Sequence, residues 1–191
     1  APHEVVATLL LKNDTDDLKS LARSMHAGGS SEGMREALSG LGTIRPQVLE
    51  RLAEATDLQA AAQVLAIAKH PLAASFARAV RRYASDGDLL RVELDLDRAL
   101  YDTMAQRAAK TSVGPDFAAY VALNIDATNV LTALKITGKG LDAETYFLEH
   151  GQHVSRRVFD AIVEDGFAAL SRMTTGPLAS LSKVESAAEV E

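Results

Sequence analysis

The sequence predicts an all-α protein, and three observations lead to that prediction. The 191 residues are 47% hydrophobic and 24% charged, which is the composition of a globular, soluble chain. Only 5% are aromatic, and the abundant Ala and Leu favour helices over strands. No segment alternates polar and apolar residues over a useful length, whereas apolar residues repeatedly recur every three or four positions, as on one face of a helix.

Glycine and proline divide the first part of the chain into helical segments. Residues 4–27 contain neither residue type, and Gly28-Gly29 then ends the helix. Ser30 and Asp57 are placed to cap helices, and Pro46 suits a first helical turn. The expected helices are 4–27, 30–38, 46–55, 57–69, a segment that Pro71 begins and Asp86-Gly87-Asp88 ends, and 89–110.

The second part of the chain has a similar pattern. Its long helix, expected over 116–137, carries on one side the residues Tyr120, Leu123, Ala127, Val130 and Leu134. Gly138-Lys139-Gly140 ends that helix. Shorter helices are expected over 142–149, 155–164 and 167–173, and the acidic tail 182–191 is expected to fray.

An internal repeat relates the two parts. Residues 11–18 align with 123–130 at an offset of 126 − 14 = 112, Gly42 aligns with Gly151 at 109, and 71–73 aligns with 177–179 at 106. A period of this length is that of a lobe rather than of a short solenoid repeat. We therefore expect two related helical lobes, residues 1–88 and 89–191.

Two aspartates are the most informative residues of the repeat. Asp14 lies in an apolar stripe with Leu11 and Leu18, and Asp126 takes the same place in the second copy. A carboxylate buried without partners would cost several kcal/mol, so we expect each to cap a neighbouring helix or to pair with an arginine. A proton-carrying role in a membrane is disfavoured, because neither stretch is apolar enough. Asp17 and Asn129, which the same offset superposes, complete the set of structural candidates.

Charge and composition exclude several classes of function. The net charge of −6 repels nucleic-acid phosphates. The chain has no cysteine, which removes thiolate nucleophiles and cysteine-based metal sites. The apolar run at residues 5–11 is far shorter than the roughly 20 residues that a membrane span needs. A membrane role would therefore require docking to other membrane components.

Other candidate motifs favour no catalytic site. His150 and His153 have a possible metal spacing, but they flank a glycine turn and lack further ligands at a fixed distance. Glu93, Asp95 and Asp97 alternate with apolar residues and are interpreted as a solvated entry to a helix. The sequence gives no positive support for an enzyme, a metal or a cofactor.

Three segments resemble a known family. They are residues 9–23, residues 96–101, and residues 124–135 with the glycine stop after them. These segments, in this order, resemble the C subunit of prokaryotic V/A-type rotary ATPases, which corresponds to the d subunit of the eukaryotic enzymes. The resemblance covers nearly the whole chain.

The resemblance implies a mechanical function in ATP synthesis and proton or sodium transport. Members of the family are all-helical funnels of three similar lobes, so this chain is expected to hold two and to lack the N-terminal one. Such a protein is a non-catalytic socket of the central stalk, which joins the rotary shaft to the membrane proteolipid ring. It is cytoplasmic and peripheral to the membrane. The alternative from the residues alone is a helical scaffold or adaptor unrelated to rotary motors.

Overall fold

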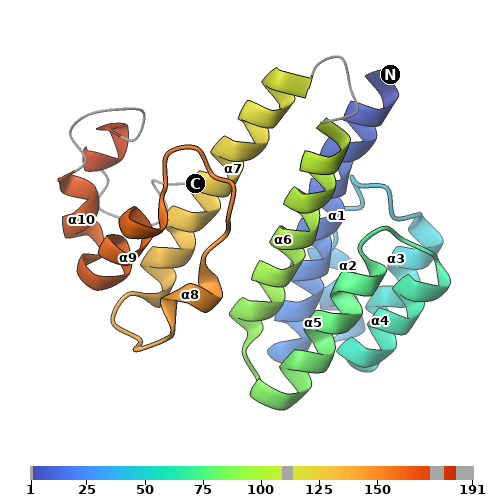
Figure 1. The fold of residues 1–191 in the computed structure, drawn as a ribbon. Coiled ribbons are helices and arrows are strands. Elements are labelled where there is room, and N and C mark those ends of the chain that lie inside the picture. Colours follow the sequence, from blue (N-terminus) through green and yellow to red (C-terminus); the bar gives the residue numbers. More distant parts are fainter. Residues whose placement is uncertain (1, 109–113, 173–178, 184–191) are drawn as a thin grey trace. The chain divides into compact units, whose positions relative to one another are not determined.

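The computed structural model describes residues 2–108, 114–172 and 179–183. These residues form two compact units, Ala1–Ser112 (unit 1) and Val113–Glu191 (unit 2). All secondary structure among the described residues is helical, which confirms the predicted fold class. Figure 1 shows the helices in chain order.

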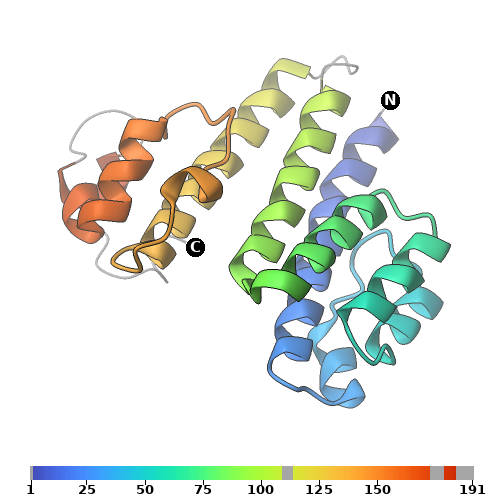
Figure 2. The same ribbon diagram turned by 60° about the horizontal axis from the view of Figure 1, so that its bottom comes forward.

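Within the described residues 2–108, unit 1 has six helices, and each packs on the next. They are α1 (Pro2–His26), α2 (Ser31–Ala37), α3 (Pro46–Ala53), α4 (Leu58–Ile67), α5 (Ala73–Asp86) and α6 (Leu89–Ala108). The ring closes because α6 returns to lie along α1, as both ribbon views show (Figures 1 and 2). The core inside this ring is apolar; its fully buried side chains include Leu18, Leu21, Leu52, Leu65, Phe76 and Leu96.

Unit 2 is built on one long helix with shorter ones beside it. Its elements are α7 (Gly114–Ile136), α8 (Ala143–Tyr146), α9 (Arg156–Asp165), α10 (Phe167–Ser171) and the 3₁₀ helix η1 (Ala179–Lys183). Helix α9 packs on α7, and Thr137 Oγ1 donates a hydrogen bond to the Ile162 carbonyl at 3.1 Å. The rings of Phe147 and Phe159 meet edge to face with centroids 5.3 Å apart, which ties the segment after α8 to α9.

The predicted helix boundaries hold where a cap specifies them. Ser30 accepts a hydrogen bond from the Gly33 amide and Asp57 from the Ala60 amide, so α2 and α4 begin as expected. Pro46 begins α3. The helix expected over 142–149 is wrong in length, because α8 makes a single turn before the chain turns extended at Phe147. The expected end at residue 110 and most of the tail 182–191 lie outside the described residues.

The boundary between the two compact units differs from the lobe boundary that the sequence repeat predicts. The predicted boundary at 88/89 falls between α5 and α6, which pack on one another within unit 1. Helix α6 packs on α1 and so belongs to unit 1. The repeat boundary rests instead on similarity between two parts of the sequence, which reflects common ancestry rather than packing. The two-lobe division at 88/89 therefore stays a prediction.

Candidate functional site

Asp14 of α1 binds the loop that leads into α3. The side chain is fully buried, and its Oδ1 accepts hydrogen bonds from the amides of Thr43 at 2.7 Å and Ile44 at 2.9 Å. Oδ2 accepts from the Thr43 hydroxyl at 2.6 Å and lies 3.2 Å from Nε2 of His70. These donors compensate the carboxylate for the loss of water. The expected partner, an arginine or the first turn of a helix, is wrong: the main donors belong to the loop before α3.

Both ring nitrogens of His70 have neighbours. The amide of Leu72 donates to Nδ1 at 3.3 Å, which leaves Nε2 as the nitrogen that donates to Asp14. Burial raises the pKa of Asp14, but hydrogen bonds from His70, Thr43 and Ile44 outweigh it and hold that pKa below its ordinary value of 3.8. Asp14 is thus the ionised centre of this site.

Asp17 binds the same loop one helical turn further along α1. Its two carboxylate oxygens accept from the amides of Ser39 at 2.7 Å and Gly40 at 3.1 Å. We call Asp14 and Asp17 the first pair. Together they fasten the α2–α3 connection to α1 at two points, in addition to the burial of Ile44 in the core.

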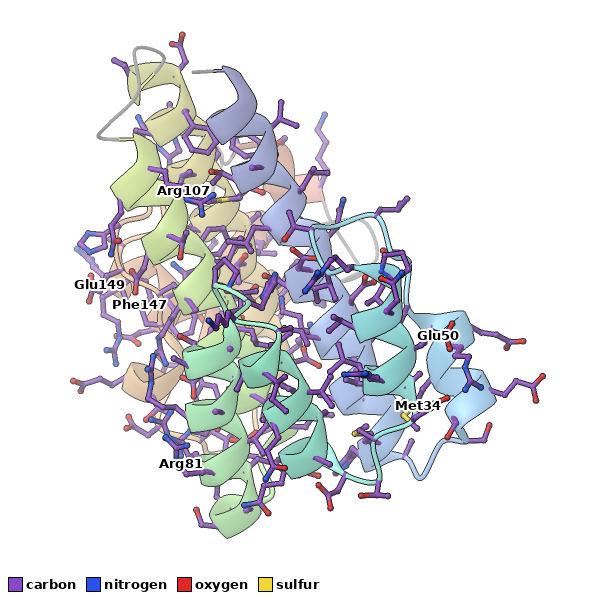
Figure 3. All side chains as sticks on the ribbon, turned by 90° about the vertical axis from the view of Figure 1, so that its right-hand side faces the viewer. Met34, Glu50, Arg81, Arg107, Phe147 and Glu149 are labelled. Atoms are coloured by element: carbon purple, nitrogen blue, oxygen red, sulfur yellow. The ribbon has the colours of Figure 1, made fainter. Side chains whose placement is uncertain are left out.

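Asp126 and Asn129 of α7, the second pair, do the same in unit 2. Asp126 accepts from three successive loop amides, those of Gln152 at 3.1 Å, His153 at 2.8 Å and Val154 at 2.8 Å. Asn129 Nδ2 donates to the Leu148 carbonyl at 2.9 Å, and its Oδ1 accepts from the Leu148 amide at 2.8 Å. Leu148 stands between Phe147 and Glu149, which Figure 3 labels. Again the donors precede a helix, here α9.

A glycine lies against the aspartate in both units. A Cβ on Gly42 would overlap Asp14 Oδ1 and would come within 2.5 Å of Asp14 Cγ and 2.9 Å of the Asp14 backbone nitrogen. A Cβ on Gly151 would overlap Asp126 Oδ1 and stand 3.3 Å from Asp126 Cγ. Only glycine lets the loop come this close to the helix. These two glycines are the pair that the sequence repeat aligns.

Further ion pairs join α6 to α1. Lys19 Nζ lies 2.5 Å from Asp97, and the Arg23 guanidinium bonds both oxygens of Glu93 at 2.5 and 2.8 Å. The expectation that Glu93 and Asp97 are solvated is wrong, since they are 9% and 7% exposed. Their helix packs along α1, and the acids meet its cations. Burial raises the pKa of Asp97, and Lys19 offsets that only in part.

Metal binding has no geometric support in the part of the chain that the structure describes. No group of three or more His, Asp or Glu side chains lies close enough to hold an ion there. His150 sits on a turn with a φ of 72°, and the His153 amide donates to Asp126. Both histidines lie within the loop that the second pair holds.

Helix α7 passes one test for a membrane span. Pro115–Ile136 is long enough and has a mean hydropathy of 1.3, so the expectation that neither aspartate-bearing stretch is apolar enough is wrong for α7. Core helices of soluble proteins pass the same test. In unit 2 the helix buries Asp126 and Asn129 against a polar loop backbone, which is the arrangement of a core helix.

Comparison with known proteins decides the family. The model of the ATP synthase (C/AC39) subunit family matches residues 1–190. The chain belongs to this family. It is 39% identical over 181 residues to the C subunit of the V-type ATP synthase of Thermus thermophilus, a match that covers 95% of this chain and 54% of the relative. The resemblance inferred from the sequence is confirmed.

Two further relatives extend the comparison within the C/AC39 family. The C subunit of the V-type ATP synthase of Deinococcus radiodurans is 38% identical over 141 residues, 74% of this chain and 39% of that protein. The C subunit of the A-type ATP synthase of Haloferax volcanii is 27% identical over 153 residues, 78% of this chain and 43% of that protein. The chain thus spans about half the length, or less, of these curated relatives.

A cavity of 490 Å³ lies near the C-terminal ends of α1 and α5 in this C/AC39 member. Met34 of α2, labelled in Figure 3, forms part of its apolar lining. Three of the polar residues on the wall are engaged within unit 1: His26 Nδ1 is 2.5 Å from the Tyr83 hydroxyl, and Asp57 caps α4.

The chemistry of the second pair predicts that Asn129→Asp destabilises the protein. A carboxylate at position 129 still accepts from the Leu148 amide but presents negative charge to the Leu148 carbonyl in a fully buried place. We expect a loss of about 2 kcal/mol in the free energy of unfolding, measured by urea denaturation. Asn124→Asp is the control on the same helix, because Asn124 is only half-buried; an equal loss in both variants would contradict the prediction.

The raised pKa of Asp97 predicts a pH dependence. A carboxyl whose pKa is higher in the folded than in the unfolded state stabilises most at low pH, and this contribution is lost as the pH rises above 3.8 through the folded pKa. Asp97→Asn removes the titration. The unfolding free energy of Asp97→Asn minus that of the parent should therefore increase between pH 4 and 7. A difference that stays constant or falls would show that burial does not govern Asp97.

Proposed function

We propose that this protein acts as a non-catalytic component of the central stalk of a V/A-type ATP synthase. The observation that carries the proposal is the family match over residues 1–190, together with 39% identity to the C subunit of a V-type ATP synthase over 95% of the chain. In this function the protein links the rotary shaft to the proteolipid ring, and it hydrolyses no ATP itself.

The fold suits a part that carries mechanical load. Transmission of torque requires that helices and the loops between them keep their positions when force is applied. In both units a buried polar pair fastens a connecting loop to the long helix, and ion pairs join α6 to α1. Such directional contacts resist sliding better than apolar packing alone, which supports a mechanical role.

The expected partners and lobe count belong to the same proposal. The subunits of the shaft and the ring are the proposed partners, and the protein reaches the membrane through the ring rather than by a span of its own. The two copies of the repeat, residues 1–88 and 89–191, are proposed to represent two of the three lobes of a funnel-shaped socket. The aspartate and glycine arrangement that recurs in both copies supports their descent from one lobe.

A chimaera tests this function. Because the chain spans 54% of the Thermus thermophilus relative, it would replace the matched segment of that relative. The chimaera would be added to membranes that hold the ATP synthase without this relative. We expect it to restore attachment of the shaft and head to the membrane sector and ATP hydrolysis coupled to ion transport. The unaltered relative is the positive control, and membranes to which neither protein is added are the negative control.

Two results would count against the proposal. A chimaera that folds, judged by its circular dichroism, but leaves shaft and head unattached would contradict the stalk function. ATP hydrolysis by the isolated chain would contradict its non-catalytic character.

A further inference from the structure

The connection between α4 and α5 contains a histidine that contacts three separate segments of unit 1. This connection is residues 68–72 (Figure 1), and the side chain of His70 within it is 7% exposed. Its Nε2 lies 3.2 Å from Asp14 Oδ2 of α1 and 3.2 Å from Thr43 Oγ1 of the loop before α3. Its Nδ1 accepts a hydrogen bond from the Leu72 amide at 3.3 Å. One imidazole therefore joins α1, the α2–α3 connection and the start of α5.

The Leu72 amide depends on that histidine. Leu72 is 1% exposed and directly precedes the first residue of α5, where backbone amides have no acceptor within the helix. Among the described residues, His70 Nδ1 is the one acceptor of this amide. The amides of His70 and Ala73, in contrast, are held by the backbone carbonyls of Leu65 and His70. The start of α5 thus relies on a lone pair that a proton can occupy.

We propose that His70 is a proton-sensitive latch, which holds the start of α5 while its ring is neutral and releases it when the ring is protonated. Histidine is the side chain whose charge changes between about pH 5 and 8. In the neutral ring Nε2 carries the proton that it donates to Asp14, so an added proton goes to Nδ1. Two donors then face each other, and the buried Leu72 amide loses its acceptor. This role of His70 does not depend on the function proposed above.

The charges around the ring keep it in place in both states. Asp14 faces Nε2 and favours the protonated ring. Two exposed cations oppose it: Arg45 lines a cavity of about 40 Å³ together with His70, and Lys69 precedes His70 in the chain. Apart from Thr43, the other residues on that cavity are apolar; they are Ile44, Val48, Leu65 and Ala68. Because Asp14 contacts the neutral and the charged ring alike, protonation releases α5 without detaching the ring from α1.

Nuclear magnetic resonance on the isotope-labelled 191-residue protein tests the proposal between about pH 8 and 5. At the upper pH, the nitrogen chemical shifts of the His70 ring should show an unprotonated Nδ1 and a protonated Nε2. As the ring is protonated, the protection of the Leu72 amide against hydrogen exchange, corrected for the intrinsic exchange rate, should fall at least about tenfold. This fall should follow the titration curve of the ring. The Gly33 amide is the internal control, because its acceptor is the Ser30 hydroxyl and its protection should stay constant.

Two variants make the result specific. In His70→Asn the side-chain carbonyl oxygen takes roughly the place of Nδ1, accepts from the Leu72 amide and gains no proton in this pH range. Protection of the Leu72 amide should then be the same at both ends of the range. His26→Asn is the matched control, since it replaces an exposed histidine that bonds the Tyr83 hydroxyl. The parent's fall in Leu72 protection should persist in this variant.

Four results would overturn the proposal. A ring whose Nδ1 is protonated at pH 8, or that stays neutral down to pH 5, would contradict the latch directly. So would Leu72 protection that is constant across the titration of the ring. An equal fall at Gly33 would show a general loosening of unit 1, and a fall that persists in His70→Asn would show another cause. If His70→Asn does not fold, judged by circular dichroism, the ring shifts and the exchange of the parent still decide.

Discussion

Replacing Gly42 with alanine should lower the free energy of unfolding by about 3 kcal/mol, although it adds a single methyl group. The new Cβ would stand 2.5 Å from Asp14 Cγ and 2.9 Å from the Asp14 backbone nitrogen. The backbone atom belongs to α1 and cannot rotate away, so the loop would have to retreat. Retreat of the loop weakens the hydrogen bonds from the amides of Thr43 and Ile44 to a buried carboxylate.

Gly33 supplies the matched control for this prediction. It is a helical glycine of α2 whose added Cβ would meet only Ser30 Oγ, at an ordinary 3.5 Å. Gly33→Ala should therefore be neutral or should stabilise by up to about 1 kcal/mol through helix propensity. Urea denaturation of both variants measures the difference. If Gly42→Ala matched Gly33→Ala, the close approach of loop and helix would be refuted.

Asp14→Ala should have the largest effect, a loss of about 4 kcal/mol. It removes the acceptor for two amides, the Thr43 hydroxyl and the His70 ring in a place without solvent access. Asp16→Ala, two residues away, is the control: Asp16 is half-exposed and pairs with Lys12 on the surface, so its loss should cost under about 0.5 kcal/mol. Similar losses in the two variants would rule out the role assigned to Asp14.

The pH dependence of Asp14 gives an independent check. Its pKa is lower in the folded protein than its ordinary 3.8, so the folded state binds fewer protons and is favoured while the group is ionised. This contribution is complete above pH 3.8 and declines as the pH falls toward the folded pKa. The stability advantage of the parent over Asp14→Asn should therefore shrink below pH 4, in the opposite direction to the effect expected at Asp97.

The sequence predicts the helices and the key positions because both depend on local or repeated signals. Caps and prolines specify where α2, α3 and α4 begin. The repeat singles out Asp14 and Asp126, because a carboxylate kept at the same place in two apolar stripes needs a common reason. In the structure the common reason is that backbone amides of a loop donate hydrogen bonds to each aspartate. Because these donors are backbone groups, no particular side chain in the sequence reveals them.

Contacts between distant segments could not be predicted in this way. His70 reaches Asp14 across 56 positions. From the sequence alone, the acidic residues of α6 look like a solvent-exposed series of charges. Only the structure shows that α1 lies beside them and pairs them with Lys19 and Arg23. Periodicity likewise identifies the apolar face of a helix but does not identify the helix that covers it.

The loops held by the two pairs should be unusual in their hydrogen exchange. Connections between helices normally exchange their amide protons quickly, because water reaches them without any opening of the fold. Here the amides of Thr43, Ile44, His153 and Val154 point at buried carboxylates. Their protons can exchange only when loop and long helix separate. Each connection should therefore open only together with its long helix, α1 or α7. A displacement of that helix should in turn displace the connection bound to it.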